Sequence, residues 1–224
     1  MNLKSKIEKT SSYYICERKD LLSMIPAGID NVLDVGCGNG GLGKILKDNG
    51  LAKKVVGIEI NAEAAKCAGK NIDKVISEDI ENANLTLEKE YFDLIIFGDV
   101  LEHLYNPWKV LNEMKLYLKK EGYILISIPN IRYYRVMLNL AFKGEFKYEE
   151  DGILDRDHIR FFTFKMLKMY MSQAGLKIIK SKRNFSGHVS FIFNALTFNI
   201  FSDFFARQYI VLAVLQRNAE PAKK

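Results

Sequence analysis

The chain has 224 residues, of which 48% are hydrophobic. That length suits one α/β domain and is too short for two domains with separate cores. The formal net charge is +6, from 33 Lys and Arg against 27 Asp and Glu. These charges are scattered and do not form the stripe that is typical of a nucleic-acid binder. We therefore expect a solvated basic surface and no nucleic-acid partner, with an anionic substrate or peripheral membrane association as the alternative.

The cysteines and the hydrophobic segments indicate a cytoplasmic protein. The three cysteines contain no C-x-x-C pair, so neither a disulfide framework nor a zinc site is indicated, and no metal is predicted. The N-terminus lacks the apolar core of a signal peptide, and the most apolar window, 189–215, is interrupted by Asp203 and Arg207.

Helices and strands alternate in the first part of the chain, which predicts a parallel sheet with helices on both faces. Helices start after capping residues such as Asn61 and Asn106, and the strands are short apolar runs. Helices are predicted at 13–24, 42–49, 62–70 and 107–122, and strands at 32–35, 55–60, 74–77, 92–97 and 123–128.

The alternation breaks at 130–163, a long aromatic and charged stretch that we interpret as a substrate-side insertion with a helix near 133–142. It resumes afterwards, with helices predicted at 163–175 and 189–205 and strands at 176–180 and 209–215. We therefore predict a single domain over 1–217 and a disordered tail at 218–224.

A glycine-rich turn follows the first strand. Gly36, Gly38 and either Gly40 or Gly41 allow the backbone to approach a ligand closely, and the N–H groups of the next helix point toward it. This spacing also satisfies the dinucleotide fingerprint G-x-G-x-x-G, with Glu59 about twenty residues further on. The glycines alone therefore predict a nucleotide-type site but do not indicate which nucleotide binds there.

Acidic residues at three strand ends favour S-adenosylmethionine over a dinucleotide. Asp34 would repel a pyrophosphate but attract the cationic amino group of S-adenosylmethionine. Glu59 has two oxygens that suit ribose hydroxyls, and Asp79 suits the adenine amino group. Each acid alone is also compatible with a helix cap or a surface position, but three along one sheet edge favour a binding site. We also expect Ile60 and Ile80, which directly follow Glu59 and Asp79, to contact the cofactor.

Four ordered motifs resemble those of class I S-adenosylmethionine-dependent methyltransferases. They are Val32-Leu-Asp-Val-Gly-Cys-Gly-Asn-Gly, Val56-Gly-Ile-Glu-Ile-Asn61, Phe92-Asp-Leu-Ile-Ile-Phe-Gly-Asp-Val-Leu-Glu-His103 and Leu118-Lys-Lys-Glu-Gly-Tyr-Ile-Leu-Ile-Ser127. The resemblance covers about 13–215. It implies a doubly wound, seven-stranded, mostly parallel α/β sheet of order 3-2-1-4-5-7-6 with an antiparallel last strand.

The same resemblance implies further site residues. Tyr14 and Arg18 stand where related sequences often carry an aromatic residue and an arginine, so they are expected to close over the methionine end of the cofactor. Asn39 replaces the family's usual Thr or Ser, a mild departure. Segments 127–132 and 152–163 resemble the branch associated with bacterial surface-polysaccharide synthesis, which implies a sugar-type acceptor.

Methyl transfer to a hydroxyl requires a base at the carboxyl edge of the sheet. His158 is the preferred candidate because imidazole titrates near neutral pH and Asp155 and Asp157 flank it. His103 is the alternative, and Asp99 is the third catalytic candidate. Either histidine is also compatible with a structural role in holding a loop.

The insertion also carries candidate substrate residues, since guanidinium and phenol groups suit phosphates, carboxylates and sugar faces. These candidates are Arg132, Tyr133, Tyr134, Arg135, Arg156 and Arg160. We predict O-methylation of a small or glycan-type acceptor, with an anionic acceptor as one form. A quinone-like acceptor, or a cofactor-binding module without turnover, is the alternative. The Met and Phe residues at 166–171 and 191–205 suit core or homodimer contacts.

Overall fold

The computed structural model describes residues 19–185 and 201–216. Seven strands form one sheet, ordered β3-β2-β1-β4-β5-β7-β6. They are β1 (Asn31–Val35), β2 (Lys54–Ile58), β3 (Lys74–Ile76), β4 (Phe92–Gly98), β5 (Leu118–Pro129), β6 (Leu176–Phe185) and β7 (Ala206–Leu215). β7 runs antiparallel to both of its neighbours, β5 and β6, whereas the ladders from β3 to β5 are parallel. The predicted fold class and strand order are confirmed.

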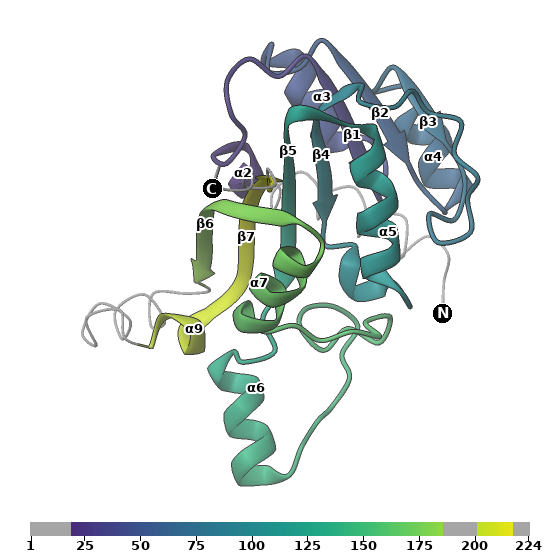
Figure 1. Ribbon diagram of the computed structural model, residues 1–224. Helices are drawn as coiled ribbons and strands as arrows, with labels where there is room; N and C mark the ends of the chain where they lie inside the picture. Colours follow the sequence, from purple (N-terminus) through teal and green to yellow (C-terminus); the bar gives the residue numbers. More distant parts are fainter. Residues whose placement is uncertain (1–18, 186–200, 217–224) are drawn as a thin grey trace, which may run out of the picture.

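Helices cover both faces of the sheet (Figure 1). They are α2 (Lys19–Leu22), α3 (Gly41–Asp48), α4 (Ala62–Ala68), α5 (Pro107–Met114), α6 (Tyr134–Leu138), α7 (Phe164–Gln173) and α9 (Ser202–Phe205). Shorter turns are the 3-10 segments η1 (Leu101–His103) and η2 (Lys115–Tyr117) and the π-helical η3 (Asn139–Lys143).

Side chains alternate between the two faces along β1 and divide the core into two layers. Leu33 and Val35 pack in one layer with residues of α5 and α7 such as Leu111 and Leu167. Val32 packs in the other layer with residues of α2 and α3 such as Leu46. Because both faces of the sheet are buried there, the central strands β1, β2 and β4 are largely apolar.

The predicted helix caps are present. The Asn61 side chain accepts from the N–H groups of Glu63 and Ala64, and Asn106 accepts from Lys109 N–H with Pro107 in the first turn. Thr163 caps α7 by accepting from Met166 N–H. These caps satisfy helix N–H groups that have no partner inside the helix.

The end of α5 differs from the prediction. The helix expected at 107–122 ends at Met114, and β5 already begins at Leu118. Leu118 is buried and pairs with Phe92, while a register shift lets Tyr123 pair with Leu94. Gly122 therefore lies inside a bulged strand, because tertiary pairing outweighs the local helical pattern.

The segment 130–163 joins β5 to α7 and carries α6 and η3. Figure 1 shows α6 projecting beyond the carboxyl ends of the parallel strands. The predicted helix near 133–142 corresponds to α6 and η3. The helix predicted at 189–205 lies mostly outside the described residues, and only α9 represents it. The predicted tail, 218–224, also lies outside the described residues.

Candidate active site

A cavity of about 790 Å³ lies where the carboxyl ends of the parallel strands meet the segment 130–163. Open α/β sheets bind their ligands at this edge, and the volume is within the range of small-molecule sites. Its lining includes groups after β1, β2, β3 and β4, from 152–158 and from β6 and β7: Gly36, Glu59, Ile60, Asp79, Ile80, Asp99, Glu102, His103, Tyr105, Asp155, Asp157, His158, Asn184, Arg207 and Gln208.

The glycine turn gives the cavity its backbone wall. Gly36, Gly38 and Gly40 have φ of 69°, 56° and 76°, values that side chains with a Cβ rarely adopt. A Cβ on Gly36 would lie 2.5 Å from Val100 Cγ2. Gly36 also lines the cavity, so both its conformation and its surroundings require glycine.

Glu59 is held at the cavity wall by two backbone donors. Gly38 N–H donates to its Oε2 at 2.8 Å and Asn61 N–H donates to its Oε1 at 2.9 Å. Each carboxylate oxygen retains a second acceptor position. Ile60 is 68% exposed beside it, so this carboxylate and this apolar side chain together fit a ribose with an adjoining base.

Asp79 is oriented in a similar way after β3. Its Oδ1 accepts from Glu81 N–H at 3.0 Å, and its Oδ2 accepts from the Asn82 side chain at 2.8 Å. Both Asp79 and the buried Ile80 line the cavity. Three of the predicted strand-end features, Gly36, Glu59 and Asp79, therefore lie along one wall.

The other predicted cofactor residues are placed differently. Asp34 is fully buried in β1 between Gly57 of β2 and Ile96 of β4, and it is not part of the described cavity lining. The predicted contact between Asp34 and the amino group of S-adenosylmethionine would require an opening from the cavity to this carboxylate. The described residues show no such opening. Tyr14 and Arg18 lie outside the described residues.

Asp99 directly follows β4 and has a strained conformation, with φ of 55°. Ser127 Oγ and Gln208 Nε2 both donate to its Oδ1, at 3.0 Å and 2.7 Å. Ser127 Oγ also lies 3.1 Å from Asp99 N–H, which donates to it. Side chains of β5 and β7 thus fix this carboxylate in the cavity. Neither Ser127 nor Gln208 was predicted from the sequence.

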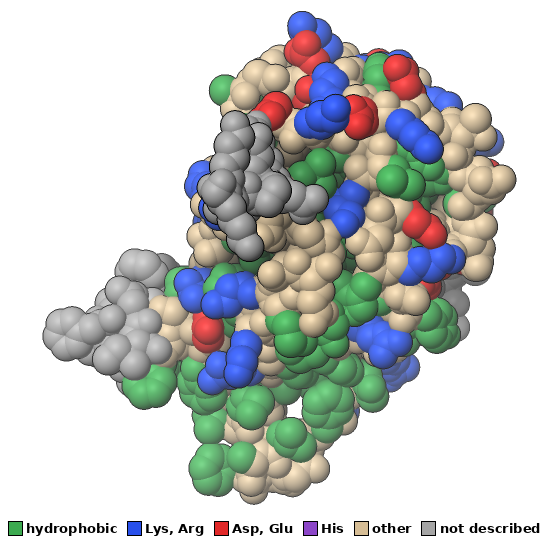
Figure 2. Space-filling view, in the orientation of Figure 1, with side chains coloured by type: hydrophobic (Ala, Val, Ile, Leu, Met, Phe, Trp, Pro, Cys, Tyr) green, Lys and Arg blue, Asp and Glu red, His purple; other side chains and the backbone are tan. Residues whose placement is uncertain are grey.

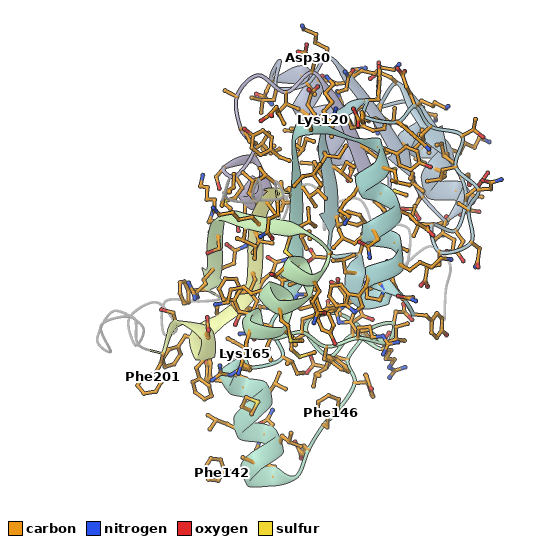
Figure 3. The ribbon with its side chains drawn as sticks, viewed as in Figure 1. Asp30, Lys120, Phe142, Phe146, Lys165 and Phe201 are labelled. Carbon is orange, nitrogen blue, oxygen red and sulfur yellow. The ribbon has the colours of Figure 1, made fainter. Side chains whose placement is uncertain are left out.

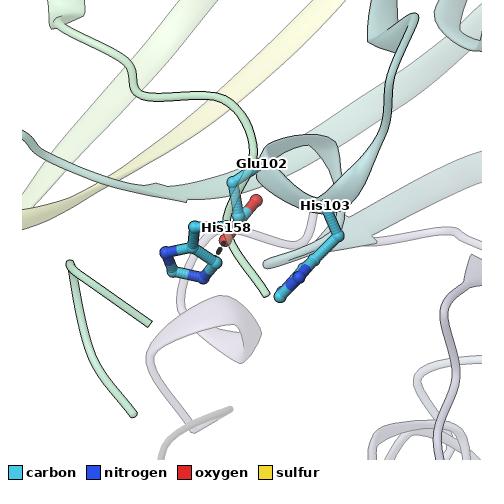
Figure 4. Close-up of side chains that lie close together, drawn as sticks. All are labelled: Glu102, His103 and His158. Carbon is cyan, nitrogen blue, oxygen red and sulfur yellow. Dashed lines mark ion pairs between the residues drawn. The ribbon is translucent and has the colours of Figure 1, made fainter. Parts of the chain in front are cut away.

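His158, His103 and Glu102 form a close cluster (Figure 4). Their rings and carboxylate come from η1 and from the loop before α7. The two imidazole centroids are 4.7 Å apart, and His158 Nε2 lies 3.9 Å from Glu102 Oε1. Glu102 is fully buried, His158 is 8% exposed, and His103 is exposed.

Backbone carbonyls determine the tautomers of both histidines. His158 Nδ1 is 3.0 Å from Ile153 O, and His103 Nδ1 is 3.1 Å from Asp157 O. A carbonyl oxygen only accepts, so each Nδ1 carries the proton and donates. In the neutral ring the lone pair is then on Nε2.

Burial lowers the pKa of His158 below its ordinary value, and the nearby His103 lowers it further, although the bond to Ile153 opposes this change. The neutral form therefore dominates at pH 7. The 3.9 Å contact with Glu102 is an ion pair only when His158 is protonated, so near neutral pH His158 presents a lone pair.

None of the predicted substrate residues of the insertion is part of the described lining of this cavity. These residues are Arg132, Tyr133, Tyr134, Arg135, Arg156 and Arg160. Tyr133 is buried against Tyr134, and Arg156 pairs with Glu150 at 3.3 Å. Arg160 donates to Tyr105 O and lines a second cavity beside Trp108. The guanidinium that lines the main cavity belongs to Arg207, which the sequence did not single out.

Solved structures define the class of the fold. The chain is similar to a SAM-dependent methyltransferase from Archaeoglobus fulgidus, with a TM-score of 0.68 and 18% identity over 95% of this chain and 99% of that chain. It is also similar to a SAM-dependent methyltransferase from Thermotoga maritima, a possible histamine N-methyltransferase, with a TM-score of 0.66 and 18% identity over 96% of each chain. The fold is therefore that of the class I methyltransferases.

The family follows from the sequence match. A family model for the methyltransferase domain matches residues 7–181, and the chain belongs to this family. The predicted enzyme class and the predicted methyl donor, S-adenosylmethionine, are thereby confirmed at the level of the family. The glycine turn, Glu59 and Asp79 provide a wall that fits this donor.

Two curated proteins are similar to the chain in sequence. An uncharacterized protein of Methanocaldococcus jannaschii is 28% identical over 78% of this chain and 72% of its own length. A ubiquinone biosynthesis O-methyltransferase of Glaesserella parasuis is 32% identical over 44% of this chain. That match spans only 45% of the enzyme's own length, so its acceptor does not transfer directly to this chain.

Proposed function

We propose that the protein methylates a hydroxyl of a small, hydroxyl-rich acceptor of the sugar or sugar-phosphate type, with S-adenosylmethionine as donor. The observation that carries the proposal is that His158, whose neutral ring has its lone pair on Nε2, lines the same cavity as the strand-end acids. Removal of a hydroxyl proton requires such an acceptor near neutral pH.

The donor half of the cavity, lined by Gly36, Glu59 and Asp79 and supported by the bond from Gly38 N–H to Glu59, would hold the nucleoside. Glu59 would accept from the ribose hydroxyls and Asp79 from the adenine amino group, while Ile60 and Ile80 contact the base. The donor, when bound, supplies an electrophilic methyl group on a sulfonium. Asp34, Gly40, Tyr14 and Arg18 remain proposed contacts of its amino-acid end.

The acceptor half, defined by Asp99, Glu102, His103, His158 and Gln208, would orient the hydroxyl. Polar groups dominate it, which suits an acceptor with several hydroxyls. Asp99 is held rigidly enough to accept a hydrogen bond from one acceptor hydroxyl. Arg207 adds a positive charge that suits a phosphate or carboxylate. His103 is the second candidate for the base.

A quinone-like acceptor is the second candidate, and an apolar surface favours it. Figure 2 shows hydrophobic side chains gathered around α6, and Figure 3 shows Phe142 pointing outward there. Phe142 is 82% exposed, with Leu138 and Leu140 exposed nearby. This surface also supports the expected peripheral membrane association. Across the described residues, no helix is long and apolar enough to cross a membrane.

A donor-turnover screen tests these proposals. Formation of S-adenosylhomocysteine is measured with nucleotide sugars, sugar phosphates and soluble catechols as parallel acceptors. Turnover with sugar compounds supports the first proposal, and turnover confined to catechols supports the second. Donor binding without turnover in any arm would favour the cofactor-binding module without catalysis, and the screen should then be repeated with amine acceptors to test N-methylation.

A further inference from the structure

Glu102, His103 and His158 bring three ligand groups together at the acceptor end of the cavity. One donor atom from each lies within 4.8 Å of the others (Figure 4). The two histidines come from different segments: η1 follows β4, whereas His158 belongs to the loop before α7. No local spacing motif joins them, which explains why the sequence predicted no metal.

The two segments are fastened to each other at the backbone. Glu102 O accepts from both Ile159 N–H and Arg160 N–H, at 3.0 Å each. The cluster is therefore held by the fold and does not depend on a chance approach of two loops.

The hydrogen bonds of the imidazoles are those of metal ligands. Each Nδ1–H donates to a backbone carbonyl, of Ile153 or Asp157. Metal-binding histidines almost always have such a partner, because it fixes the ring and leaves the other nitrogen for the ion. Here His158 Nε2 faces Glu102 Oε1 at 3.9 Å. Two electron-pair donors that face each other at this distance leave room for a cation between them.

We propose that Glu102, His103 and His158 bind one divalent transition-metal ion of the zinc type, with an open position toward the acceptor. Two imidazoles and one carboxylate are a ligand set that zinc uses in catalytic sites, whereas magnesium and calcium prefer oxygen ligands. Bonds of about 2.0–2.1 Å place tetrahedral ligands roughly 3.3 Å apart. Binding of the ion would draw the three donor atoms, which lie within 4.8 Å of one another, to that spacing.

This inference rests on the proposed function, because the ion would bind the acceptor oxygen and lower the pKa of its hydroxyl. The ion and a directly acting His158 base need the same Nε2 lone pair. In the metal-loaded protein His158 would therefore be a ligand, and the ion would promote ionisation of the acceptor hydroxyl, whose proton would pass to solvent water.

Zinc binding to the chelator-treated full chain tests the site without any acceptor. The exposed Cys67 is replaced by Ser throughout, to remove an unrelated zinc ligand. Calorimetry is expected to give one zinc per chain, with at least about 100-fold weaker binding in His103→Gln and His158→Gln. Glu113→Gln, an exposed carboxylate of α5, is the matched control and should bind as the parent does. Cobalt should give the visible absorption of a four- or five-coordinate nitrogen and oxygen site.

Equal zinc binding in all variants, or none in the parent, would overturn the site. His103 is exposed, so its variant reports on the ligand even if the change at the buried His158 impairs folding. Donor turnover separates the two proposals. Full turnover in metal-free protein would retain the methyltransferase function and remove the ion from it. Histidine-dependent zinc binding without turnover of any acceptor would retain the site and remove the function.

Discussion

The donor half and the acceptor half of the cavity are held together over very different sequence distances. In the donor half, Gly38 N–H donates to Glu59 across 21 positions, within one β-α-β unit. In the acceptor half, Gln208 donates to Asp99 across 109 positions, and His103 contacts Asp157 O across 54. The first arrangement depends on local turn geometry, whereas the second exists only once the whole sheet and the segment 130–163 are in place.

The contrast implies that variants in the two halves have separable effects. Changes in the donor half should alter affinity for the methyl donor, and changes in the acceptor half should alter turnover with the donor still bound. A variant that moved both quantities equally would show that the halves are not independent.

The largest effect is expected for His158→Gln. Loss of the Nε2 lone pair should lower kcat about 100- to 10,000-fold, whether the lone pair accepts the proton or binds an ion. Affinity for S-adenosylmethionine, measured by calorimetry, should stay unchanged because His158 is outside the donor half. Wild-type kcat in this variant would remove His158 from the chemistry.

The next largest effect is expected for Gly36→Ala. The new Cβ meets Val100 Cγ2 at 2.5 Å and the residue must keep φ near 69°, so donor affinity should fall about 10- to 100-fold, equivalent to roughly 1.4–2.8 kcal/mol. Gly28→Ala is the matched control, because Gly28 also has positive φ but a Cβ there meets nothing within 4 Å. Equal donor affinity in both variants would contradict the close-approach role of Gly36.

A smaller effect is expected for Glu59→Gln. The amide keeps one acceptor oxygen but its NH₂ faces a backbone N–H, so donor affinity should fall about 10-fold, the scale of one charged hydrogen bond. Glu63→Gln on the exposed face of α4 is the control. An unchanged dissociation constant for Glu59→Gln would exclude the carboxylate from donor binding.

The smallest effect concerns stability at the opposite end of the strands. Burial raises the pKa of Asp93, but hydrogen bonds from Lys119 and from Asn31 N–H outweigh it and lower the pKa overall. A lowered folded-state pKa adds stability above the unfolded pKa, near 3.9, and this stability is lost as pH falls through the folded value.

The contribution should be at most about 1 kcal/mol, because Lys119 is partly exposed. Urea unfolding should therefore show a smaller difference between wild type and Asp93→Asn at pH 3 than at pH 7. Donor affinity at pH 7 should be equal in the two proteins. A difference in unfolding free energy between the two proteins that grows toward low pH would contradict a lowered pKa for Asp93.

The sequence predicted the parts of the molecule that short-range chemistry determines. The glycine turn and the caps at Asn61 and Asn106 each depend on a few consecutive residues, whereas the strand order followed from the resemblance to class I methyltransferases. Glu59 and Asp79 could be predicted as site residues for the same reason, since each lies at the end of an apolar strand. Their presence in the cavity lining follows from the parallel sheet alone.

Features that depend on contacts between distant parts of the chain could not be predicted from local sequence patterns. The early end of α5 is set by the pairing of Leu118 with Phe92, and local periodicity favoured a longer helix. The partners of Asp99 come from strands that are distant in sequence. The guanidinium and phenol groups of 132–135 looked available for substrate, yet Tyr133 packs into the protein and Arg135 lies over the Tyr134 ring.

The most direct test of the central claim is transfer of a ¹³C-labelled methyl group from S-adenosylmethionine to an acceptor found by the turnover screen, with NMR of the product. The account predicts an O-methyl resonance that forms rapidly with wild type and is strongly reduced with His158→Gln. An N-methyl resonance, or equal rates of O-methylation by the two proteins, would contradict it.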